Sequence, residues 1–153
     1  MKKSQRIKTI VNIKATQEKT ALEALGAVQK IFLDMQGQVD SLKTYRKEYQ
    51  SRFERLGAKG ANVLQLLEFR SFIDKLDKAI QGQEQELSSI ETQLKAKRKL
   101  WEALHHKTHN LEKFFDSALA IEVKQADKRE QLEQDERASR IGRNKSSDIG
   151  NAE

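Results

Sequence analysis

The feature that most constrains this chain is a long repeat of apolar residues spaced alternately four and three positions apart. In the first half the repeat runs from Ile7 to Leu56, and in the second half from Phe69 to Ala118. Twelve of the fifteen positions in each series are apolar or aromatic. This spacing puts the side chains along one side of a helix, as in a coiled coil. The sequence therefore predicts two long helices, each with a continuous apolar seam.

The two series match in length. The first comprises Ile7, Val11, Lys14, Glu18, Ala21, Leu25, Val28, Phe32, Met35, Val39, Leu42, Arg46, Tyr49, Phe53 and Leu56. The second comprises Phe69, Ile73, Leu76, Ile80, Gln83, Leu87, Ile90, Leu94, Lys97, Trp101, Leu104, Thr108, Leu111, Phe115 and Ala118. Both cover 50 residues, so two helices of roughly 75 Å can pair along their full length.

A short segment rich in glycine, 57–62, separates the two series and suits a helix stop followed by a turn. Because a short connection makes neighbouring helices antiparallel, the predicted fold is all-α, a long two-helix antiparallel coiled-coil hairpin over 1–139. We place helix 1 at about 3–56, the turn at 57–68, and helix 2 at about 69–125, fraying to 139. The last segment, 140–153, combines glycine, asparagine and serine with mixed charge and is predicted to be a disordered tail.

Antiparallel pairing fixes an expected register. If the midpoint lies near Ala61, the numbers of facing residues add to 122, which sets Phe53 against Phe69. In this register Lys14 faces Thr108 in a polar layer. A further group of charged seam residues faces apolar partners and is expected to extend toward solvent: Glu18, Arg46 and Lys97. Two chains exchanging helices would use the same seam, so the sequence leaves monomer and dimer open.

Composition argues against catalysis. Charged residues make up 34% of the chain, the mean hydropathy is −0.79, and cysteine and proline are absent. We find no glycine-rich phosphate loop, no zinc-protease pair and no nucleophile elbow, and a two-helix coil has no enclosed cavity for chemistry. We therefore expect no enzyme activity and no cofactor. The lack of cysteine fits the cytoplasm, and the isolated apolar residues near the N-terminus predict neither a signal peptide nor a membrane span.

Two charged or titratable clusters have unremarkable explanations. His105 and His109 lie four apart and could share a transition metal, but no third ligand is apparent, so we expect solvated side chains and no metal site. Residues 1–20 carry six basic side chains against Glu18. This arm could attract nucleic acid or anionic lipid, but a solvated helix start is favoured because no aromatic residues interleave.

Apolar side chains also lie beside the seam, at the heptad position g. They are Ile10, Ile31, Tyr45, Phe72, Ala79, Leu100 and Phe114. A dimeric coil usually carries charge at this position. Part of this widened stripe is therefore expected to meet a partner, with side-by-side self-association as the competing explanation.

Two stretches, Leu42–Tyr49 (LKTYRKEY) and Phe72–Ile80 (FIDKLDKAI), resemble the flagellar export protein FliJ family, and the size and two-helix plan agree over about 1–140. The resemblance implies a non-catalytic component of the flagellar type III export apparatus, similar to the stalk of rotary ATPases. It implies binding to a hexameric export ATPase (FliI-like), to an export-gate protein (FlhA-like) and to substrate-specific export chaperones, with no nucleic acid. It also implies a cytoplasmic location, peripheral to the inner membrane at the flagellar base.

The resemblance further implies a gate-binding surface, which we name the recognition strip. Its residues are Gln38, Leu42, Tyr45, Tyr49, Phe72, Leu76, Ala79 and Gln83. A histidine is familiar in the family where this chain has Gln83. All eight lie at position d or g, and pairing them across the hairpin gives numbers that add to 121, so they form one continuous strip.

The opposite end, Ile7–Leu25 with Lys97–Ala118, would then be proximal to the ATPase. Two alternatives remain at this point. One is the coiled-coil stalk of a virulence type III secretion system. The other is a basic coiled-coil protein that binds nucleic acid.

Overall fold

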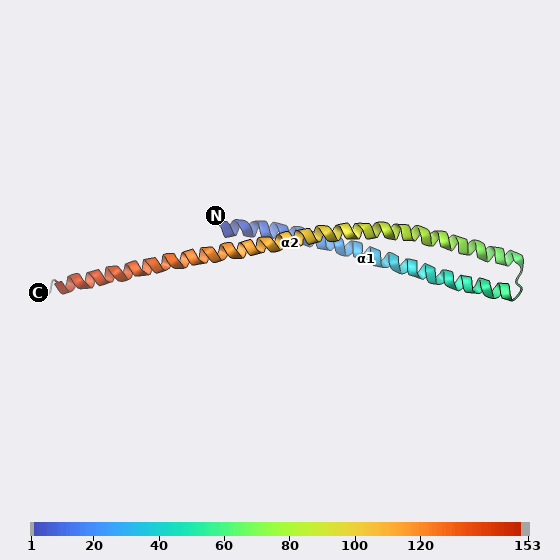
Figure 1. Ribbon diagram of the computed structural model, residues 1–153. Coiled ribbons are helices and arrows are strands. Elements are labelled where there is room, and N and C mark those ends of the chain that lie inside the picture. The colour runs from blue at the N-terminus through green and yellow to red at the C-terminus, as the bar shows by residue number, and fades with distance from the viewer. Residues whose placement is uncertain (1, 151–153) are drawn as a thin grey trace. The chain divides into compact units, whose positions relative to one another are not determined.

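The computed structural model describes residues 2–150, and nearly all of them are helical. Helix α1 is Lys3–Ala58, with 56 residues, and helix α2 is Val63–Gly150, with 88 residues. Figure 1 shows the two helices joined by one short loop. The predicted all-α hairpin is confirmed. The absence of proline explains the length of both helices, because nothing removes a backbone hydrogen bond from their interiors.

The chain divides into two compact units, each containing part of both helices. The turn unit is Gln17–His105, and the terminal unit is Met1–Thr16 with His106–Glu153. In the turn unit Arg46 forms an ion pair with Asp77, and Tyr49 packs on Phe72. The residue numbers of the first pair add to 123, and those of the second pair add to 121. The expected register of 122 lies between these two values and is confirmed for this unit.

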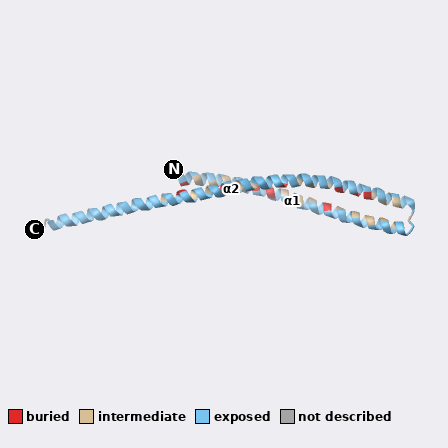
Figure 2. Ribbon diagram, viewed as in Figure 1, coloured by how far each residue is buried: buried red, intermediate tan, exposed pale blue. Residues whose placement is uncertain are grey.

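The core of the turn unit is small, and Figure 2 shows only a few buried positions, in red, along the two helices. Its buried apolar residues are Ala21, Leu25, Val39, Ile73, Leu76, Ile80 and Leu94. All seven belong to the two predicted seams. No described side chain is less than 2% exposed, because each seam residue of a two-helix coil has solvent on both flanks.

Two charged seam residues have polar partners in the structure, where the sequence predicted apolar ones. The guanidinium of Arg46 donates hydrogen bonds to the carboxylate of Asp77 on α2. Glu18 Oε1 lies 2.6 Å from His105 Nδ1. Each partner lies one residue beyond the position that the register sets opposite, so a long side chain reaches it from within the seam.

In the terminal unit the first turns of α1 lie along α2. The backbone N–H of Ser4 donates to Glu122 Oε1 at 3.1 Å, and its hydroxyl donates to Oε2 at 2.5 Å. These hydrogen bonds hold the pKa of the Glu122 carboxyl below its usual value. Lys8 Nζ lies 5.7 Å from the centre of the Phe115 ring. Ser4 is buried, so the seam continues one step upstream of Ile7.

The turn is shorter than predicted. Gly60 has a φ of 74°, and Ala61 N–H donates to the carbonyl of Leu56 while Gly60 N–H donates to that of Gly57. These two bonds form a Schellman motif, which stops α1. Asn62 then caps α2, because its Oδ1 accepts a hydrogen bond from the N–H of Leu64 at 3.3 Å. As a result the segment 63–68, predicted as turn, is the first part of α2.

The end of α2 also differs from the prediction. Residues 140–150, predicted to be disordered, are helical, whereas 151–153 lie outside the described residues. Side chains along this segment bond only within the helix, as in the Arg140–Glu136 pair and the Ser146 hydroxyl that donates to the carbonyl of Arg143. Composition indicated disorder because of the glycine and asparagine residues, but the segment contains no proline, so no backbone hydrogen bond is removed and the helix continues through Gly142 and Asn144.

Candidate functional site

The recognition strip brings aromatic rings from both helices together in the turn unit. The ring centres of Tyr45 and Tyr49 are 4.9 Å apart, and those of Tyr49 and Phe72 are 4.6 Å apart. Tyr45 meets Phe72 edge to face at 6.3 Å. Three of the eight predicted residues therefore form one aromatic cluster that spans α1 and α2. Such packing favours a fixed ring geometry.

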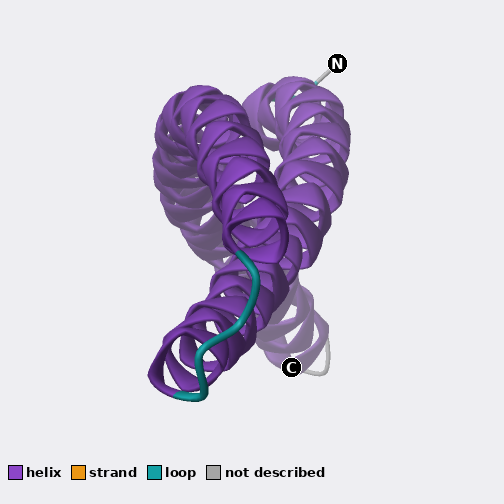
Figure 3. Cartoon of the chain, turned by 90° about the vertical axis from the view of Figure 1, so that its right-hand side faces the viewer, coloured by secondary structure: helices purple, strands orange, loops and turns teal. Residues whose placement is uncertain are grey.

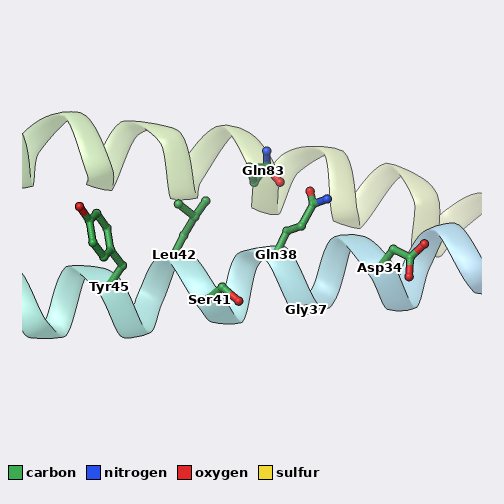
Figure 4. Close-up of a pocket in the computed structure, with 7 residues that line it drawn as sticks. All are labelled: Asp34, Gly37, Gln38, Ser41, Leu42, Tyr45 and Gln83. Carbon is green, nitrogen blue, oxygen red and sulfur yellow. The ribbon is translucent and has the colours of Figure 1, made fainter.

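Beside this cluster lies an open groove of about 790 Å³. It is lined by Asp34, Gly37, Gln38, Ser41, Leu42, Tyr45 and Gln83. Figure 4 shows Gln38, Leu42 and Tyr45 rising from α1 toward α2. The groove thus joins four members of the recognition strip, and Tyr45 belongs both to the groove and to the aromatic cluster.

Members of the strip differ in exposure. Tyr45 is 42% exposed, whereas Leu76 is 8% exposed and belongs to the core of the turn unit. Gln38 and Ala79 are exposed, and the others are half-buried. Leu76 therefore belongs to the packed core beneath the strip and has little surface available to a partner.

Polar atoms in the strip are incompletely paired. Gln83 Oε1 is buried and has no hydrogen-bond partner among the described residues. The Tyr45 hydroxyl lies 3.4 Å from that of Tyr49. This hydrogen bond, together with burial, raises the pKa of Tyr45. A buried acceptor without a donor costs free energy, on the order of 1–3 kcal/mol, so this amide oxygen lowers the stability of the packing around Gln83.

Two ion pairs join the helices over the same stretch. Lys43 Nζ lies 2.8 Å from Glu84 Oε1, and Arg46 pairs with Asp77. Hydrogen bonding to Glu84 raises the pKa of Lys43. Exposed pairs of this kind add little stability, but they fix the axial position of one helix against the other.

His105, considered above as a possible metal ligand, contacts one residue on each helix. The ring of His105 stacks on that of Trp101, with centres 5.1 Å apart, and its Nδ1 contacts Glu18. Among residues 2–150 no group of three or more histidine, aspartate or glutamate side chains is arranged to hold a metal ion.

Sequence reasoning missed three residues of the groove: Asp34, Gly37 and Ser41. A signal was present for two of them, because Asp34 lies four positions before Gln38 and Ser41 lies three positions after it. Gly37 lies three positions after Asp34 and four before Ser41, so it shares a helix face with those two residues. Sequence reasoning also missed the contact of Glu18 with His105. That contact joins two helices, so no spacing within one helix could indicate it.

No helix within residues 2–150 has the length and apolar content needed to cross a bilayer. The groove is open and adjoins the aromatic cluster, a combination that is common in protein-binding surfaces.

Comparison with known proteins gives one match. The family model described as "Flagellar FliJ protein" matches residues 2–147. Searches of curated proteins and of solved structures found no match. The family is non-catalytic. This chain therefore belongs to the flagellar FliJ family and is a component of the flagellar export apparatus.

Proposed function

We propose that this chain is a cytoplasmic stalk that couples the export ATPase to the export gate, peripheral to the inner membrane at the flagellar base. The observation that carries the proposal is the recognition strip, where an aromatic cluster and a groove lie side by side on the turn unit. Family membership supports a role in export. The surface itself supports a role in binding another protein.

The gate protein is the proposed occupant of the strip. Tyrosine and phenylalanine are favoured anchors of protein interfaces, because they bury a large area at a small cost in conformational entropy. Tyr45 keeps 42% of its surface exposed although it packs on two other rings. It is therefore held in place without being covered, and it gains buried area when a partner binds.

The polar part of the groove gives the interface its specificity. Gln83 lines the groove, and its side-chain amide can form hydrogen bonds with polar groups of a partner. Gln38 lines the same groove and supplies a second amide. We propose that the gate protein hydrogen-bonds with these two amides, with the aromatic cluster alongside providing most of the affinity.

The terminal unit is the proposed site for the hexameric export ATPase. It carries exposed apolar side chains on both of its helical segments: Ile10, Ile13, Phe114, Leu119, Ile121 and Val123. It also carries most of the basic arm of residues 1–20. Escort of substrate-specific export chaperones is part of the same proposal, without assigned residues.

The test is binding of the double variant Tyr45→Ala/Phe72→Ala to the cytoplasmic domain of the gate protein by calorimetric titration. We expect affinity to fall by at least about tenfold, because two anchors are removed, while helicity is retained. Phe114→Ala is the control, since this ring is 66% exposed and belongs to the terminal unit. Unchanged affinity in the double variant would show that the gate binds elsewhere.

A further inference from the structure

The first turn of α2 presents three aliphatic side chains to solvent. Val63, Leu64 and Leu67 are 70%, 62% and 60% exposed. These three positions fall within about 100° of the helix circumference, so they share one side of the helix. We name these three residues the tip patch. They lie where α2 begins, next to the loop that faces the viewer in Figure 3.

The tip patch is held in a defined position. The Schellman motif ends α1 at Ala58, and Asn62 caps α2 immediately before Val63. Leu66, between the patch residues, is half-buried. Leu66 thus packs within the turn, whereas the side chains of the tip patch are exposed to solvent. Nothing inside the turn unit explains why these three residues are apolar.

Basic residues flank the patch in the sequence. From residue 52 to residue 70 the chain carries four basic and two acidic residues. Arg55, Lys59 and Arg70 are exposed, and none of them forms an ion pair in the part of the chain that the structure describes. The tip therefore combines apolar side chains with cations that have no anionic partner of their own.

We propose that the hairpin tip docks on an anionic lipid bilayer, with Val63, Leu64 and Leu67 inserted at the headgroup boundary and Arg55, Lys59 and Arg70 on lipid phosphates. The charge complements an anionic leaflet. Shallow insertion of an apolar helix face beside basic residues is a recognised mode of peripheral binding. This inference does not depend on the assignment of the recognition strip.

Size and composition favour a bilayer over a protein partner. A stable protein interface covers about 800 Å² on each side and is enriched in aromatic residues, methionine and arginine at its centre. The tip patch has three aliphatic residues and no aromatic one, unlike the recognition strip. A bilayer needs no shape complementarity, and it accepts a small convex end.

Both signals are required. A few inserted side chains, or a few cations, give only weak and reversible binding when they act alone. Binding should therefore depend on anionic lipid and also on the apolar patch. The basic arm of residues 1–20 offers a second route to anionic vesicles. Binding through this arm depends on charge alone, so substitutions in the tip patch should not weaken it. Binding through the tip should depend on both the charges and the tip patch.

The first experiment is vesicle flotation of the full chain, using phosphatidylcholine vesicles with and without phosphatidylglycerol. We expect binding to the anionic vesicles and a loss of about tenfold in the triple variant Val63→Gln/Leu64→Gln/Leu67→Gln. The matched control is Leu22→Gln/Leu33→Gln/Leu100→Gln, which removes three exposed leucines elsewhere in the turn unit. Circular dichroism checks that both variants remain helical.

A second pair of variants tests the charges. Arg55→Gln/Lys59→Gln/Arg70→Gln should weaken binding, whereas Lys30→Gln/Lys78→Gln/Lys99→Gln, with the same loss of charge at exposed positions outside the basic arm, should weaken it less. Equal losses in the two charge variants, or full binding by the tip-patch variant, would overturn the proposal in favour of charge-driven binding. Absence of wild-type binding to anionic vesicles overturns it as well.

A third measurement reports insertion directly. The chain has no cysteine, so Leu64→Cys carries a single environment-sensitive fluorophore. We expect its emission to shift to the blue on anionic vesicles, with no shift for the same label at Leu33→Cys. Gate binding is measured separately without lipid. If the tip-patch variant loses gate affinity and the Leu64 label does not respond to vesicles, the tip is a protein-docking site and the bilayer proposal fails.

Discussion

The ring of Tyr49 on α1 packs against the ring of Phe72 on α2, with centres 4.6 Å apart and planes inclined at 42°. Both residues are half-buried, and Tyr45 lies against both of them. This pair links the packed seam to the exposed recognition strip. The aromatic cluster therefore has an inner part that stabilises the hairpin and an outer part that is available to a partner.

Substitution should separate these two parts. Tyr49→Ala is expected to lower the free energy of unfolding by about 2 kcal/mol, because it removes a ring from the seam. Tyr45→Ala should cost about half as much, because Tyr45 is more exposed. A double-mutant cycle of Tyr49 and Phe72 by urea denaturation should give a coupling of about 1 kcal/mol. A coupling near zero would mean that the ring contact adds nothing to stability.

Val39 should be sensitive to truncation, because it is only 3% exposed. Val39→Ala is expected to destabilise the hairpin by about 2 kcal/mol, from lost burial and the cavity left behind. Leu33→Ala, on the same helix and 57% exposed, should change stability by no more than about 0.5 kcal/mol. Thermal melts followed by circular dichroism compare the two, and similar effects would contradict the assignment of the core.

Substitution of Gly37 by alanine is expected to raise stability and to lower the affinity for the gate protein. A Cβ at Gly37 or at Gly26 meets nothing within 4 Å, so Gly37→Ala and Gly26→Ala should each stabilise α1 by about 1 kcal/mol. Only Gly37 lines the groove. If the gate protein approaches closely there, Gly37→Ala weakens gate binding while Gly26→Ala does not. Equal affinities would mean that the partner leaves this side of the groove open.

Acid should release the start of α1 from α2 in the terminal unit. Hydrogen bonds from Ser4 lower the pKa of Glu122, so the ionised carboxylate is the form that the folded state favours. The resulting stabilisation is fully present above the unfolded pKa and is lost as pH falls through the lower folded value. The protection factors for amide exchange in the segment 3–7, which correct for the slower intrinsic exchange at low pH, should therefore fall at acid pH.

Two variants check this pH dependence. Glu122→Gln should exchange rapidly at neutral pH and lose the acid-induced change, whereas Glu130→Gln, which alters an exposed carboxylate further along α2, should behave like the wild type. An unchanged profile for Glu122→Gln would assign the acid response to another group.

The last part of α2 should open readily. Residues 123–150 are exposed throughout, and Figure 2 shows this part of the helix as exposed. A helix without tertiary contacts is marginal in water. Removal of residues 140–153 is therefore expected to lower the total helical signal while leaving the urea midpoint of the hairpin unchanged. A lower midpoint would indicate that this segment contributes to packing.

The sequence alone determined the two helices, the seam and the antiparallel register. Val39, Ile80 and Leu94 could be assigned to the core because a repeat of four and three positions is a property of a single helix. The same reasoning placed Tyr45 and Phe72 beside the seam. These features depend on local periodicity and on one short connection, both of which can be read along the chain.

Only the tertiary structure decided how individual side chains are used. It buried Leu76 while leaving Tyr45 accessible, paired Arg46 with Asp77, and brought Asp34 and Gly37 into the groove. In the structure α2 begins at Val63, because Gly60, with its positive φ, and the Asn62 cap suffice to reverse the chain. Burial and pairing depend on which atoms of the opposite helix lie within a few ångströms, and that distance is set by packing, which periodicity does not encode.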